Sequence, residues 1–279
     1  MIIDFHTHVY PPSFRERREE LSKVDATFGE IYSNPRSKLA TATELVEAMD
    51  RDGVAAAVVM GLGWTDQTLA QEANDYLLQS AQEHPGRLIP FCSVNPAWGK
   101  DALAEVERCA NLGAKGLGEL HPDTQALDVT DEKLMAPFME RALDLGLPVL
   151  THASEPVGHL YTGKGRTTPQ KLESFIKAFP QNTIICAHWG GGLPFYALMP
   201  EVEEAMANVY FDSAASPFLY RPDVFQRAVD LVGAGKVLLG TDYPLLTHQR
   251  LLNQVLENPF SEDVKERILG GNARKLLGL

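Results

Sequence analysis

One strand–helix–strand unit lies between Leu147 and His188, and its pattern decides the fold prediction for the whole chain. It begins with the run LPVLTH (residues 147–152) and ends with the run NTIICAH (residues 182–188). Between the two runs, Pro169 opens a segment with apolar residues at positions 172, 175, 176 and 179, which is the spacing of one helix face. Because both runs are largely apolar rather than alternating, they indicate strands that are buried on both faces.

The same unit recurs along the chain. We predict eight strands, at residues 2–6, 54–60, 87–94, 114–119, 147–152, 182–188, 208–213 and 236–242. Their starts are 26 to 35 residues apart, except for a first interval of 52 residues. This pattern predicts a single α/β domain over residues 1–279, folded as a (β/α)₈ TIM barrel. A doubly wound sheet is the alternative, but no GxGxxG motif follows the first strand.

The long first interval implies an insertion at residues 10–40, which we expect to be a loop over the active site because barrel sites form at the carboxyl ends of the strands. The loop after the fifth strand, residues 153–168, is rich in glycine and also carries cations. Five side chains from the two loops are the candidate ligands for a substrate carboxylate: Arg15, Arg17, Arg18, Lys164 and Arg166. The alternative is that both segments are ordinary solvated loops.

Composition excludes several classes of partner. The 279 residues contain 25 Lys and Arg against 37 Asp and Glu, a net charge of −12, which argues against nucleic-acid binding and against docking on an anionic membrane. No segment reaches the ~18 consecutive apolar residues that a membrane-spanning helix needs. The three cysteines are far apart in the sequence and form no CxxC motif, so we expect a reduced, cytoplasmic protein.

Metal-type ligands stand at the ends of several predicted strands. The first strand ends in His6-Thr7-His8, the fifth in His152 and the eighth in Asp242. Residues i and i+2 of a strand point to the same side, so both His6 and His8 can enter the barrel mouth. Three imidazoles and one carboxylate suit one divalent ion, Zn²⁺ first, with Mn²⁺ and other ions as alternatives.

The chain resembles the amidohydrolase superfamily, in particular the branch that contains aminocarboxymuconate-semialdehyde decarboxylase, other aromatic-acid decarboxylases and lactonase-type hydrolases. The matching segments are residues 3–8, 150–152, 187–194, 239–244 and 271–276. The resemblance implies metal ligation by His6, His8, His152 and Asp242. It also implies that His188 acts as an acid/base beside the metal, and it suggests a homodimer.

Glu119 is the ambiguous position. Binuclear relatives carry a carboxylated lysine at the end of the fourth strand, where this chain has Gly118-Glu119-Leu120. A single metal ion is therefore favoured. Glu119 either contacts the metal or orients one of the histidine ligands.

Two reactions fit these residues. The first is hydrolysis of a small lactone, amide or related cyclic acid derivative by a metal-activated water, with Asp242 or His188 as the base. The second is non-oxidative decarboxylation of an aromatic or muconate-type acid with the same ligands. We favour the hydrolase because the chain is short for such a decarboxylase. A barrel that kept its metal site but only binds a ligand is the non-enzymatic alternative.

Overall fold

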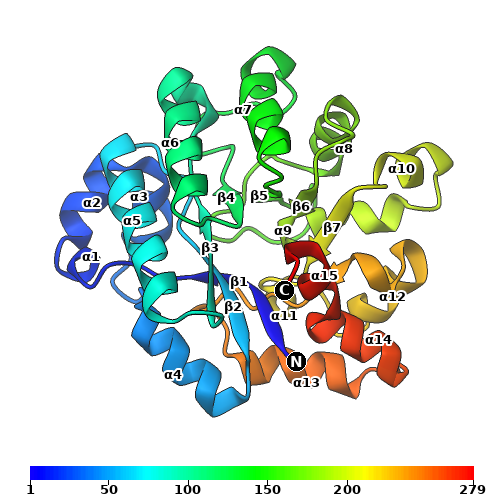
Figure 1. Cartoon of the computed structure of the whole chain (residues 1–279). Helices are drawn as coiled ribbons and strands as arrows, with labels where there is room; N and C mark the ends of the chain where they lie inside the picture. Colours follow the sequence, from blue (N-terminus) through cyan, green and yellow to red (C-terminus); the bar gives the residue numbers. More distant parts are fainter.

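The computed structural model describes residues 1–279 and contains eight parallel strands in the order β1 to β8. The ring is closed by hydrogen bonds between β1 and the segment that follows β8, from Phe5 N to the Leu239 carbonyl (2.6 Å) and from His8 N to the Tyr243 carbonyl (2.7 Å). Figure 1 shows the helices arranged around these strands. The predicted (β/α)₈ barrel is confirmed.

The strands are short and lie within or next to the predicted runs. They are β1 (Ile3–His8), β2 (Ala56–Met60), β3 (Leu88–Cys92), β4 (Gly116–Leu120), β5 (Val149–Thr151), β6 (Ile184–Cys186), β7 (Val209–Asp212) and β8 (Val237–Leu238). All but one of their residues are buried, as expected for strands covered on both faces.

The α-helices are α1 (Ser13–Glu16), α2 (Arg18–Val24), α3 (Ala26–Tyr32), α4 (Ala42–Asp52), α5 (Gln67–Glu83), α6 (Lys100–Asn111), α7 (Glu132–Asp144), α8 (Pro169–Ala178), α9 (Ala187–Gly190), α10 (Pro200–Ala205), α11 (Ser216–Leu219), α12 (Val224–Val232), α13 (His248–Glu257), α14 (Glu262–Glu266) and α15 (Asn272–Leu277). Short turns of other helix types are η1 (Pro96–Trp98), η2 (Leu193–Tyr196), η3 (Ala234–Lys236) and η4 (Arg267–Gly271). Helix α8 begins with Pro169 and buries Leu172, Phe175 and Ile176, so its predicted apolar face is the packed one.

A register shift in β1 places the two histidines of this strand. The pairing with β2 goes from Asp4 opposite Ala57 to Thr7 opposite Val59, so β1 has one extra residue between these points. Phe5 packs in the cluster that contains Ile3, Ala56 and Val58. The extra residue allows the next residue, His6, to turn toward the mouth of the barrel as well, beside His8.

The insertion at residues 10–40 is largely helical, whereas we had predicted a loop. Helices α1, α2 and α3 occupy most of residues 10–40, and in Figure 1 they lie together at one side of the barrel, next to α5. Their buried side chains include Phe14, Leu21 and Phe28, which form one apolar cluster with Trp64 and Leu69. A segment with this much apolar area to bury folds onto the barrel instead of remaining an extended loop.

None of the helices has the length and apolar character that crossing a membrane requires. All three cysteines are buried and carry free thiols.

Candidate metal centre

His6 and His8 form the first part of the site. Their Nε2 atoms are 3.1 Å apart. His6 Nδ1 lies 2.8 Å from Asp212 Oδ2, and His8 Nδ1 lies 3.1 Å from the Gly61 carbonyl oxygen. A carboxylate and a carbonyl can only accept, so each Nδ1 carries the proton and donates it. In the neutral rings, two unprotonated Nε2 atoms therefore face each other, an arrangement that needs a cation between them.

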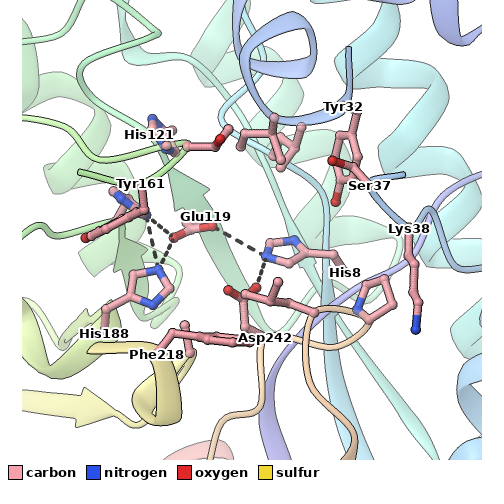
Figure 2. Close-up of a pocket in the computed structure, with 18 of the residues that line it drawn as sticks. His8, Tyr32, Ser37, Lys38, Glu119, His121, Tyr161, His188, Phe218 and Asp242 are labelled. Carbon is pink, nitrogen blue, oxygen red and sulfur yellow. Dashed lines mark hydrogen bonds and ion pairs between the residues drawn. The ribbon is translucent and has the colours of Figure 1, made fainter. Parts of the chain in front are cut away.

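Two carboxylates complete this group of donors. Glu119 Oε2 lies 3.6 Å from His8 Nε2 and 3.7 Å from His6 Nε2, and Asp242 Oδ1 lies 3.3 Å from His8 Nε2. Glu119 is 3% exposed, and Figure 2 shows that it lies between His8 and His188. Imidazole nitrogens and carboxylate oxygens at such short range are a fitting donor set for a divalent cation. His6, His8 and Glu119 are placed so that they could share one ion.

His152 and His188 lie on the other side of Glu119. His152 Nδ1 is 3.0 Å from Glu119 Oε1 and 3.2 Å from His188 Nε2. His188 Nδ1 lies 3.1 Å from the Ala214 carbonyl, which fixes its proton on Nδ1 and directs Nε2 into the site. Glu119, His152 and His188 are a second trio with metal-ligand spacing, and Glu119 belongs to both trios.

The carboxylates and histidines of the site shift each other's pKa values. Burial alone would raise the pKa of Glu119, but the charge of His6 and the hydrogen bonds from the neighbouring histidines hold the pKa well below its usual range. Burial alone would lower the pKa of His188, but the contact with Glu119 and the charge of Asp242 raise it to about 9. Two ionised carboxylates among buried imidazoles thus need positive charge, which either protons or a divalent cation can supply.

Backbone strain marks two of these positions. His188 and Asp242 have φ angles of 55° and 65°, in the left-handed region that residues other than glycine rarely adopt. Such strain persists only where the surrounding contacts impose it, and it is concentrated at functional sites. In this chain, His188 N donates to Asp212 and Asp242 N donates to the His6 carbonyl, so hydrogen bonds within the site hold both conformations.

A cavity of about 580 Å³ opens above these donors. His8, Glu119, His152, His188 and Asp242 form its floor, and Figure 2 shows the side chains around it. The wall combines apolar residues with a few polar ones: Ile31, Tyr32, Asn34, Arg36, Ser37, Lys38, Leu62, His121, His159, Tyr161, Phe218, Leu219 and Leu245. The helical insertion therefore contributes one side of the cavity, including two cations.

The five cations that we expected to bind substrate do not line this cavity. Arg15 pairs with Glu44, Arg17 pairs with Glu72, and Arg18 donates to the carbonyls of Tyr32 and Asn34. Lys164 donates to the carbonyls of Val157 and His159, and the backbone of Arg166 is anchored to Asp123. Arg18 and Lys164 thus bind carbonyls of their own segments, whereas Arg15 and Arg17 pair with carboxylates of α4 and α5. The role of the five cations toward a substrate stays a prediction. The cavity wall has Arg36 and Lys38 instead.

Two residues of the site were not among the predicted site residues. Asp212 is fully buried and holds both His6 and the backbone of His188; its signal was a carboxylate at the end of the apolar seventh strand. His121 lies on the cavity wall and stacks on His152, with ring centroids 4.2 Å apart. It follows the fourth strand, and the sequence had led us to expect it either in solvent or beside a metal ligand.

Comparison with known proteins places the chain in a family. A family model described as "Amidohydrolase" matches residues 3–279, and the chain belongs to that family. A curated relative from Dictyostelium discoideum, 2-amino-3-carboxymuconate-6-semialdehyde decarboxylase, is 25% identical over 334 aligned positions, which cover 99% of this chain and 91% of the relative.

Two solved structures share the fold. The 5-carboxyvanillate decarboxylase of Sphingomonas paucimobilis is 19% identical, with a TM-score of 0.82 over 100% of this chain and 99% of that one. A dihydroxybenzoic acid decarboxylase from Polaromonas sp. JS666, solved with manganese and the inhibitor 2-nitroresorcinol, is 19% identical, with a TM-score of 0.72 over 100% and 97% of the two chains.

These relatives overturn our prediction of a hydrolase, and that prediction is wrong. All three are decarboxylases, and the chain spans 91% or more of the length of each. The preference depended on the chain being too short for a decarboxylase, but the shorter chain still matches these decarboxylases almost from end to end. The ligands themselves could not decide, because both reactions use the same set.

Proposed function

From its membership of the amidohydrolase family, we propose that this protein is a metal-dependent, non-oxidative decarboxylase of a small aromatic or related unsaturated carboxylic acid. The observation that carries the proposal is the convergence of unprotonated imidazole nitrogens and ionised carboxylates at the floor of one cavity. The sequence relatives supply the reaction class.

The proposed metal ligands are His6, His8, His152 and Asp242, with Glu119 beside them. Asp212 and the Gly61 carbonyl hold the rings of His6 and His8 through Nδ1, which orients the ligands and raises their basicity. One divalent ion is expected per chain. Zn²⁺ and Mn²⁺ are the candidates, because imidazoles favour the first and carboxylates suit the second.

When bound, the metal supplies the positive charge that holds the acidic groups of the substrate. The apolar wall at Leu62, Phe218 and Leu219 then surrounds the carbon skeleton. His188 delivers a proton to the carbon that bears the carboxylate. The bond to the carboxyl carbon breaks, its electron pair returns to the skeleton, and CO₂ leaves, so that one proton is consumed for each CO₂ released.

We further propose that residues 1–279 act as one domain, with residues 10–40 forming a wall of the active site. Arg36 and Lys38 lie in this segment and line the cavity. They are suited to bind a carboxylate against the overall charge of −12, because short contacts outweigh a repulsion that salt screens beyond about 8 Å. A homodimer stays a prediction.

The test is a decarboxylation assay on protein reconstituted with Mn²⁺ or Zn²⁺. We expect CO₂ release from at least one member of a panel of hydroxybenzoic, aminobenzoic and muconic acids, and loss of this activity after chelation. Acid release from lactones without CO₂ release would contradict the proposal. Binding of an acid with no turnover by any metal form would instead indicate a ligand-binding barrel.

A further inference from the structure

His121 is a buried histidine that the proposed reaction does not use. It directly follows β4, is 2% exposed and lines the cavity. Its ring lies nearly parallel to that of His152, with an interplanar angle of 21°. Its Nε2 atom is buried and has no hydrogen-bond partner in the protein. Figure 2 shows His121 at the edge of the cavity, above Glu119 and Tyr161.

A chain of hydrogen bonds fixes the proton on the other ring nitrogen. His121 Nδ1 lies 3.0 Å from Thr124 Oγ1, which is 2.6 Å from Thr27 Oγ1. The Thr27 hydroxyl also contacts the Gly63 carbonyl oxygen, and Thr124 Oγ1 lies 3.1 Å from the His121 carbonyl oxygen. Each hydroxyl has a single proton to donate, whereas a carbonyl only accepts.

The possible arrangements of these protons lead to one tautomer. If Thr27 donates to Gly63, Thr124 must donate to Thr27, and Nδ1 must then donate to Thr124. If Thr124 donates to the His121 carbonyl instead, Nδ1 again has to donate to Thr124. Nδ1 would be an acceptor only if Thr27 did not donate to Gly63, and the Gly63 carbonyl would then lose this donor. The His121 carbonyl keeps a donor in every arrangement, because Gln125 N lies 3.0 Å from it. Nδ1 therefore carries the proton.

The free Nε2 atom is consequently a hydrogen-bond acceptor. No carboxylate lies within ion-pair distance of His121, whereas His6, His8, His152, His188 and His248 each have one. Nε2 has no hydrogen-bond partner in the protein, so nothing in the protein would accept a second ring proton at this place. Gly163 is the residue next to it: a Cβ added there would lie 3.9 Å from Nε2.

We propose that His121 Nε2 accepts a hydrogen bond from a hydroxyl or amino group of the substrate and so determines specificity. The identity of the ligand as an unsaturated carboxylic acid rests on the proposed function; the acceptor rests on the geometry alone. A buried acceptor without a partner costs free energy. The cavity therefore favours a ligand that brings a donor to this point and rejects an analogue that lacks it.

The first experiment measures the tautomer on wild-type protein loaded with Zn²⁺, by ¹⁵N NMR of the histidine rings. The His121 signals are assigned by their loss in His121→Phe. We expect a protonated Nδ1 and an unprotonated Nε2. A proton on Nε2 would overturn the inference, and this measurement does not depend on whether the protein decarboxylates anything.

The second experiment compares the binding of 2-, 3- and 4-hydroxybenzoate with that of their methoxy ethers, which accept but cannot donate. We expect wild-type protein to prefer one hydroxybenzoate over its ether about tenfold, and His121→Phe, which retains an aromatic ring beside His152, to lose this preference. Thr124→Val is the second variant, because it removes the hydroxyl that accepts the proton of Nδ1. Without this partner the ring can take the other tautomer, so the preference should weaken although the substituted residue does not contact the ligand.

Three results would overturn the inference: an unchanged preference in His121→Phe, equal affinities within every pair, or no binding of any of the six compounds. The proposed function is judged separately, by CO₂ release. A protein that decarboxylates acids without any preference for a donor would refute the role of His121 alone.

Discussion

Replacement of Asp212 by Asn should weaken metal binding without disturbing the fold. Asp212 Oδ1 accepts from the backbone N–H groups of His188 and Ala214, both at 3.0 Å, whereas Oδ2 accepts from His6 Nδ1 at 2.8 Å. An asparagine keeps both backbone bonds only if its oxygen occupies the Oδ1 position. Its NH₂ group then faces His6 Nδ1 and requires that nitrogen to accept. The proton of His6 moves to Nε2, and this ligand loses its lone pair.

The expected loss follows from this tautomer change. Removal of a partner that orients a ligand lowers metal affinity about 10- to 100-fold, which corresponds to about 1.4–2.8 kcal/mol. The assay is a chelator competition that gives the Kd for Zn²⁺ or Mn²⁺, with circular dichroism to confirm the fold. Asp223→Asn is the matched control, because Asp223 is exposed and pairs only with Arg221 on the surface. A Kd for Asp212→Asn within twofold of the wild-type value would refute the reasoning.

Three further predictions follow from the same structure. His188→Ala should keep its metal and lose about 10²- to 10⁴-fold in kcat; loss of the metal would identify His188 as a ligand instead. Arg36→Ala should raise KM for an acidic substrate more than it lowers kcat, whereas Arg227→Ala, an exposed arginine outside the cavity, should change neither. Burial lowers the pKa of His248, but Asp4 and then Asp52 raise it above its ordinary value, so the stabilisation by these pairs is complete below about pH 6.5 and is lost as the pH rises through the folded-state pKa. Denaturant unfolding of wild type and His248→Gln should therefore differ by about 3 kcal/mol at pH 6 and by less at alkaline pH; a difference that is constant with pH would contradict this.

The backbone architecture was predictable because it depends on local pattern. Helix α4 (Ala42–Asp52) begins at the capping box of Thr41 and Glu44, and α8 begins at Pro169, as their sequences indicate. The main donors of the site were predictable for a related reason. His6 and His8 end an apolar run, and parallel strands in a barrel bring their carboxyl ends to one rim.

The pairs of side chains that contact each other were not predictable, because the two partners are often far apart in the sequence. Nothing near Arg17 in the sequence indicates Glu72, and nothing near Thr124 indicates that Thr27, 97 residues away, would complete the hydrogen bonds that fix the tautomer of His121. A flexible cationic side chain near the rim can pair with a carboxylate of a neighbouring helix as readily as with a substrate. The predicted ligands also could not distinguish hydrolysis from decarboxylation, because both reactions use them. The relatives indicated the reaction class.

The sequence by itself determined the barrel, the three strand ends that carry the predicted ligands and the position of the insertion, because strand and helix periodicity are encoded in neighbouring residues. The tertiary structure alone decided that the insertion is helical, that Glu119 belongs to both trios with metal-ligand spacing, and that Asp212 fixes the proton of His6. The physical reason is that burial removes water as a partner. Each buried polar atom must then find a protein partner, and only the complete fold determines which one is within reach.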